Sequence, residues 1–331
     1  MTSRPPIRRW MRMLLLAVAF VAASCGSVPP PRSPAATGSP GPTGSTAPSA
    51  TAGAPAGAPF ANLLTLSHGD LLLVDSDGRT RSVSGPGERI EAASAARGTI
   101  VARTAGPVFH MATVPGADVD RLSWRELAID PSIARRPLSE FALSPAADRL
   151  AILAAEIGSG EPFEVVVVDL ETAATRVVPV DREPNGPPVW LDSSTVLLEV
   201  IASAASGSFL RLGVDSGVAG DVKAQGIGPS IAGDGTAVAV LAAGREPTVH
   251  VLPVSDWIGG AAPETGEAVT GQVDALHVAL DATGRRVAFD AADADGTAAS
   301  LSVYARDVGG WSVGATIPIN GEPPRWFGWI R

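Results

Sequence analysis

Short apolar stretches alternate with polar turns through most of the chain beyond residue 60. Each turn separates two apolar segments that are too short for helices, which predicts a series of β-hairpins. The same unit recurs at 91–103, 141–153, 188–200, 229–241 and 277–289. In four units the strands have anchor residues seven positions apart, namely Ala93 and Ile100, Leu143 and Leu150, Ile231 and Val238, and Leu280 and Val287; in the remaining unit Trp190 and Val196 are one position closer.

The spacing of these hairpins predicts the architecture. Successive first anchors lie 50, 47, 41 and 49 residues apart, and Trp326 follows the last of them by 46. After most hairpins comes a further pair of strands, such as the valine-rich stretch at 163–178. Four strands in a repeat of about 40 to 50 residues are typical of a β-propeller blade. The sequence therefore predicts an all-β propeller of four-stranded blades over residues 60–331.

The two ends of this region complete one blade between them. Residues 62–84 supply three strands without a first one, whereas "RWFGWIR" at 325–331 supplies a first strand with nothing after it. Pairing the two closes a ring of six blades and removes exposed sheet edges. We expect Trp326, Phe327 and Trp329 to be core residues of the closing blade.

The sequence motifs of the repeats resemble those of the TolB-type propeller family. Its blades carry a Ser-Pro-Asp-Gly-Arg-like turn, of which "SPAADR" at 144–149 is a degenerate copy, and a Val-Asp-Leu-x-Thr-Gly-like hairpin, which "VDLET" at 168–172 matches fairly well. The resemblance covers nearly all of 60–331 and implies a TolB-like, WD-like fold. Because the motif is common to many propellers, it implies little about function.

The N-terminus resembles a bacterial lipoprotein signal peptide. A basic segment ends at Arg12, and an apolar run too short to cross a membrane leads to the only cysteine, Cys25. The resemblance implies attachment of diacylglycerol to the Cys25 thiol and cleavage after Ser24, so that 1–24 is removed, although Ala22 stands where the family prefers Leu or Val. The other interpretation is a free cysteine beside an ordinary cleavage site. Arg8 and Arg9 leave both Sec and twin-arginine export open.

Residues 25–59 predict a disordered tether. From Gly26 to Pro59 every residue except Val28 and Arg32 is Gly, Ser, Pro, Ala or Thr. Such a composition buries too little apolar surface to offset the entropy of ordering. We expect the lipidated cysteine and this segment to hold the propeller at the membrane surface.

The charge of the chain argues against nucleic-acid partners. All 34 acidic residues but only 21 of the 25 basic ones lie beyond Cys25, which gives that part a net charge of −13. Nucleic acid and anionic lipid headgroups bind through Lys and Arg, so both should be repelled. Contact with the membrane is therefore expected through the N-terminal lipid.

Motifs for catalysis and metal binding are sparse. The nearest approach to a nucleophile elbow, "GPSIA", places Ser230 on a predicted blade strand, where a structural role is expected. The four histidines are dispersed without zinc-site spacing. We interpret "DAADADG", with Asp290, Asp293 and Asp295, as a polar hairpin turn, since Asp-Gly often marks turns; a calcium loop is the less favoured alternative, because its final glutamate is missing.

These observations predict a non-enzymatic function. The first strands, which would line the central channel, carry residues such as Ala93, Phe141, Val189, Ser230 and Val278, and this set is mostly apolar and small. We expect a monomeric, cofactor-free, lipid-anchored propeller on the outer face of the cell membrane that binds an envelope or secreted protein. The alternative is a propeller hydrolase or lyase with polar side chains converging in the channel.

Overall fold

The computed structural model describes residues 62–330 apart from 75–77, 115–121, 131–132, 134–137, 155–162, 204–205, 243–246, 271–274, 293–298 and 320–325. Residues 53–331 form one compact unit. The predicted signal peptide and tether, 1–59, lie outside the described residues. Within the described part of the chain, no helix is both long and apolar enough to cross a membrane.

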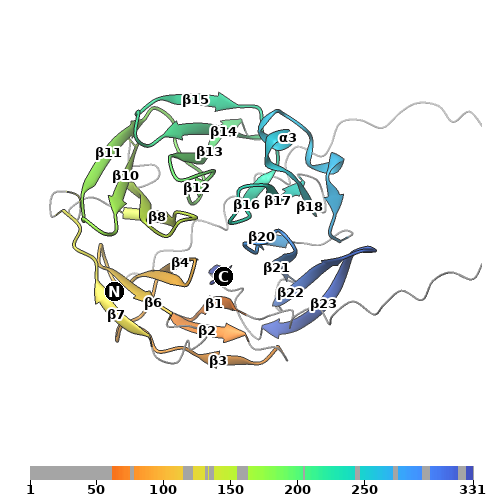
Figure 1. Cartoon of the computed structure of the whole chain (residues 1–331), viewed down its shortest axis with the longest axis horizontal. Helices are drawn as coiled ribbons and strands as arrows, with labels where there is room; N and C mark the ends of the chain where they lie inside the picture. Colours follow the sequence, from red (N-terminus) through yellow and green to blue (C-terminus); the bar gives the residue numbers. More distant parts are fainter. Residues whose placement is uncertain are drawn as a thin grey trace, which may run out of the picture. The chain divides into compact units, whose positions relative to one another are not determined.

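Six four-stranded antiparallel sheets, here blades A to F, are arranged around a common centre (Figure 1). From the inside outwards, blade A contains β24 (Trp326–Trp329), β1 (Leu63–Ser67), β2 (Asp70–Val74) and β3 (Thr80–Ser82). Blade B contains β4 (Ala92–Ala96), β5 (Thr99–Arg103), β6 (Phe109–Thr113) and β7 (Ser123–Glu126). Blade C contains β8 (Leu138–Leu143), β9 (Arg149–Ala154), β10 (Phe163–Asp169) and β11 (Thr175–Val180).

The second half of the chain repeats this plan. Blade D contains β12 (Val189–Trp190), β13 (Thr195–Ser203), β14 (Ser206–Gly213) and β15 (Ala219–Val222). Blade E contains β16 (Ile227–Ile231), β17 (Ala237–Ala242), β18 (Thr248–Pro253) and β19 (Glu267–Ala268), with the short helix α3 (Val254–Ile258) and the 3-10 turn η2 (Pro263–Thr265) between its last two strands. Blade F contains β20 (Ala275–Leu280), β21 (Arg286–Ala292), β22 (Ala299–Asp307) and β23 (Gly310–Ile319).

The last strand closes the ring, which confirms the prediction of a six-bladed propeller completed by the C-terminus. Strand β24 pairs with β1 from Trp326 opposite Leu66 to Trp329 opposite Leu63. Phe327 and Trp329 are 5% and 6% exposed, and Trp326 is partly buried. These aromatic residues are core residues, as the sequence predicts.

The hydrophobic core lies between the blades. The described residues form six buried apolar clusters, and each joins two neighbouring blades. Side chains of a strand alternate between its two faces, and in this fold both faces are covered. In β10, for example, Val165 and Val167 face blade D, whereas Val166 and Val168 face blade B. This two-sided burial explains why the strand appears in the sequence as a continuous valine run.

The predicted hairpin anchors are correct in four blades and wrong in blade B. Leu143 faces Leu150, Trp190 faces Val196, Ile231 faces Val238, and Leu280 faces Val287. In blade B, however, Ile100 pairs with Ala95 rather than Ala93. The turn there consists of Arg97 and Gly98 alone, at φ of 45° and 79°. Two residues with positive φ make the tightest hairpin turn, which moves the pairing by two positions.

Hydrogen bonds also join the first strands of neighbouring blades. The Ser94 hydroxyl accepts a bond from the Leu143 amide, and the Ser230 hydroxyl accepts one from the Leu280 amide, each at 2.9 Å. The Trp190 indole donates to the Ala142 carbonyl at 2.9 Å. Ser230 therefore links blades E and F, which agrees with the structural role expected from the sequence.

Candidate functional site

A histidine and a buried carboxylate meet where the first strand of blade F begins. The pairing of β20 with β21 is irregular between Ala275 and Val278, which brings the His277 backbone opposite Asp290. One Asp290 oxygen accepts the His277 amide at 2.7 Å, and the other accepts His277 Nδ1 at 2.8 Å. Asp290 is 1% exposed, whereas the His277 side chain is 38% exposed. The carboxylate therefore fixes the orientation of an imidazole that still reaches solvent.

This pairing determines which imidazole nitrogen is available. A proton on Nδ1 that is donated to Asp290 leaves Nε2 of the neutral ring as an acceptor. The ring also meets Phe327 of β24 edge to face, with 6.4 Å between the ring centroids. His277 Nε2 makes no hydrogen bond to a described residue. Chemically, such a nitrogen can accept a proton or a hydrogen bond from a ligand.

A second carboxylate occupies the equivalent position in blade D. The Glu199 side chain accepts bonds from Asn185 Nδ2 at 3.0 Å and from the Gly228 amide, at the start of β16, at 3.4 Å. Burial raises the pKa of the Glu199 carboxyl above its ordinary value, and these two hydrogen bonds offset only part of the rise. Glu199 thus connects blade D to blade E.

An arginine occupies the same position in blade B. Arg103 donates to the Leu138 carbonyl, at the start of β8, at 2.7 Å. It also forms an ion pair with Glu91 at 3.6 Å. Arg103 therefore connects blade B to blade C much as Glu199 connects D to E.

These three charged residues follow a pattern of alternating blades. In each blade, the second strand directs alternate side chains towards the following blade, and one such position lies near the strand's end. The strand registers show which residue occupies this position in each blade. From blade A to blade F they are Leu66, Arg103, Leu153, Glu199, Leu241 and Asp290. Leucine and a charged residue thus alternate around the ring. The end of the ring where the first strands begin is polar in blades B, D and F.

Two of the residues expected to line the channel lie between blades instead. Ala93 and Phe141 are 4% exposed and belong to the clusters between blades, because the side chains of a radial sheet point at its neighbours. The polar groups at this end come from the second strands and from the irregular starts of the first strands. Sequence reasoning missed them because it considered the first strands alone.

The other predicted site residues are only partly described. Asp293 and Asp295 fall in 293–298, outside the described residues, as does Cys25. Both Asp290 oxygens accept hydrogen bonds from His277, which is a role other than that of a cation ligand. Among the residues that the structure does describe, no three His, Cys, Asp or Glu side chains are arranged to hold a metal. The preference for a polar turn over a cation site at 290–296 stays a prediction.

Comparison with solved structures places the fold beside TolB propellers. The chain matches a putative TolB from Agrobacterium tumefaciens with a TM-score of 0.53 and 15% identity, over 74% of this chain and 86% of that one. It matches TolB from Acinetobacter baumannii with a TM-score of 0.58 and 14% identity, over 82% and 67%. The fold is thus similar to that of TolB-type six-bladed propellers. No protein-family model and no curated protein matches the sequence.

Proposed function

We propose that the chain is a lipoprotein, anchored through Cys25 at the outer face of the cytoplasmic membrane, whose propeller is a non-enzymatic protein-binding module of the cell envelope. The signal-like N-terminus, the lone cysteine and the tether composition support the anchor. The likeness to TolB propellers supports a binding module at the level of the fold class.

One structural observation carries the proposal of a binding module. At the polar end of the ring, Arg103 and Glu199 are engaged by the backbone of the following blade. Groups held in this way stiffen the ring and are poorly placed for proton transfer or nucleophilic attack. A stiff ring presents a preformed surface, which lowers the entropic cost of binding a partner.

A second candidate function rests on the His277–Asp290 pair. A carboxylate that orients an imidazole, with the second ring nitrogen free, is the arrangement of a general base. A hydrolase or lyase acting at this end of the ring would use His277 Nε2 as the proton acceptor. Asp290 would be a positioning residue.

Site-specific crosslinking in intact cells tests the two candidates. A photo-crosslinking residue at position 277 should capture a discrete partner if the polar end of the ring binds protein. The same residue at the fully exposed Val308, on the β22–β23 turn, serves as the control. Equal labelling from both positions would contradict binding at this end. Turnover of an envelope polymer that is abolished by His277→Asn would favour the enzyme.

A further inference from the structure

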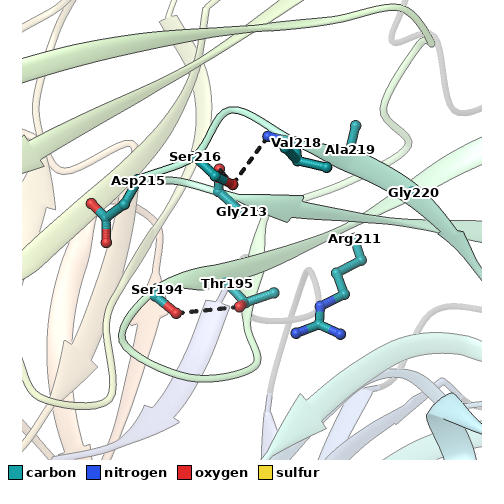
Figure 2. Close-up of a pocket in the computed structure, with 9 residues that line it drawn as sticks. All are labelled: Ser194, Thr195, Arg211, Gly213, Asp215, Ser216, Val218, Ala219 and Gly220. Atoms are coloured by element: carbon teal, nitrogen blue, oxygen red, sulfur yellow. Dashed lines mark hydrogen bonds between the residues drawn. The ribbon is translucent and has the colours of Figure 1, made fainter.

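A hollow on blade D is lined entirely by residues of that blade (Figure 2). It is open to solvent and has a volume of about 440 Å³. Its walls come from the start of β13, the end of β14, the β14–β15 turn and the start of β15. Figure 2 shows the Arg211 side chain extending from the sheet beside Thr195.

Arg211 breaks the pattern of the six blades. It lies on the third strand opposite Leu197, which faces blade E. In the other five blades the residue paired at this position is Leu73, Met111, Val167, Val251 or Val303. Each of those apolar side chains packs into the core between two blades. Blade D alone has an exposed cation there.

A glycine opens the space next to this cation. Gly220 of β15 pairs with Arg211 in the outermost strand. The equivalent residues of the other blades are Arg81, Arg125, Arg176, Glu267 and Ala315. A Cβ atom added at Gly220 would have no heavy atom within 4 Å beyond its chain neighbours. The missing side chain therefore leaves room beside the guanidinium.

Arg211 is the positively charged residue that lines the hollow, and the nearby carboxylates bind other groups. The Arg211 guanidinium has no hydrogen-bond or ion-pair partner among the described residues. Asp215 is bound by Arg149, with both oxygens within 3.1 Å of its Nη1. Asp192 accepts the amide and hydroxyl of Ser194 at 2.7 and 2.8 Å.

The positive charge of Arg211 nevertheless acts on the carboxyl group of Asp192. Burial raises the pKa of its carboxyl, but hydrogen bonds from Ser194 and Thr195, together with the charge of Arg211, outweigh burial and hold that pKa below its ordinary value. The carboxylates of Asp192 and Asp215 thus lie near the hollow, and each already accepts hydrogen bonds from a residue other than Arg211. They leave the guanidinium available but repel a dianion more strongly than a monoanion.

We propose that this hollow binds a carboxylate that carries a short apolar group. A guanidinium matches a carboxylate with two parallel hydrogen bonds. The apolar group would lie against Val218, which lines the hollow and is 68% exposed. A free small acid and the C-terminus of a peptide share this chemistry. The site is independent of the polar end of the ring and of the proposed partner-binding function.

Ligand-observed NMR with the purified full chain tests the proposal. The probes are isovalerate and its amide, and N-acetyl-Gly-Val with a free or an amidated C-terminus. We expect the two acids to bind and the two amides not to bind. Binding by isovalerate alone would identify a small acid as the ligand, and tighter binding by the dipeptide acid would identify a chain terminus. Equal binding of acids and amides, no binding of any acid at millimolar concentration, or tighter binding of inorganic phosphate would overturn the proposal.

Two variants and a control separate charge from shape. Arg211→Val introduces the residue type that other blades carry, so the fold should be retained while acid binding weakens by about tenfold to a hundredfold. Gly220→Val should fill the space and weaken binding while leaving the charge in place. Arg176→Val removes an exposed arginine from the neighbouring blade and should change nothing. Acid binding by Arg211→Val at the parent affinity would contradict the site.

Discussion

The amide of Gly98 donates a hydrogen bond to the carbonyl oxygen of Ile330 at 2.7 Å, which joins the turn of the second blade to the end of the chain. The Trp329 indole donates to the Ala279 carbonyl at 3.3 Å on the other side of β24. The C-terminal strand therefore contacts blades B and F as well as its own blade.

Removal of the closing strand should unfold the propeller. Deletion of 325–331 exposes the inner edge of β1 and the surface that Phe327 and Trp329 cover. The single change Trp329→Ala should already cost about 3 to 5 kcal/mol of a total stability of about 5 to 15 kcal/mol. Thermal melting measures both, with Val308→Ala as an exposed control. A deletion variant that melts cooperatively at the parent temperature would be incompatible with ring closure.

Cys25→Ala should release the protein from the membrane. Without a thiol there is no acceptor for the diacylglycerol that the signal-like N-terminus implies. Cell fractionation followed by blotting measures the distribution, and Cys25→Ser serves as an isosteric second variant. If both variants stay in the membrane pellet as fully as the parent, the anchor does not depend on this residue.

Ser230→Ala should destabilise the propeller without affecting any activity. The change leaves the buried Leu280 amide without its acceptor, which costs about 1 to 3 kcal/mol. Urea unfolding measures the loss, and Ser84→Ala at an exposed position should be neutral. An unchanged unfolding midpoint for Ser230→Ala would contradict the role of this hydroxyl between blades E and F.

The stability of the propeller should depend on pH through Glu199. Its folded-state pKa is raised, so its contribution to stability is fully present below the unfolded pKa, near 4.5, and is lost as the pH rises through the folded value. Glu199→Gln cannot titrate and should lack this part of the decline. Urea unfolding of both proteins between pH 4.5 and 7 compares the slopes. Parallel curves would show that Glu199 has an ordinary pKa.

Chelation should leave the propeller unchanged. We expect neither partner capture nor the melting temperature to respond to EDTA, because the prediction is a cofactor-free module. The competing hypothesis places a cation at Asp290, Asp293 and Asp295. A fall of several degrees on chelation, reversed by calcium, would establish that cation site and remove the metal-free interpretation.

The architecture could be predicted from the sequence because each blade repeats one apolar pattern. The anchors at Leu143 and Leu150 lie in one hairpin, so their pairing follows from the turn between them. The closing strand was also predictable, since the first blade lacks a strand that the C-terminus supplies. The tight turn at Arg97 and Gly98 was missed, although a glycine before an apolar strand is its usual signal.

The polar groups could not be predicted in the same way. His277 and Asp290 meet only because β20 is irregular beside the pairing of Val278 with Phe289. The alternation of charged residues and leucines on the second strands requires the registers of all six blades. Arg211 did leave a signal, because it is a charged residue between two leucines in the run "FLRLG".

The pairing of β24 with β1 also sets an order of events during synthesis. The ribosome completes β1 some 260 residues before β24, and at about 5 to 20 residues per second this interval lasts on the order of tens of seconds. Through that time the first blade lacks its innermost strand and has an open inner edge, while the later blades are completed one after another. The newborn chain therefore passes through a period in which Leu63 to Ser67 can pair with another molecule, and the pairing of β24 with β1 ends that period.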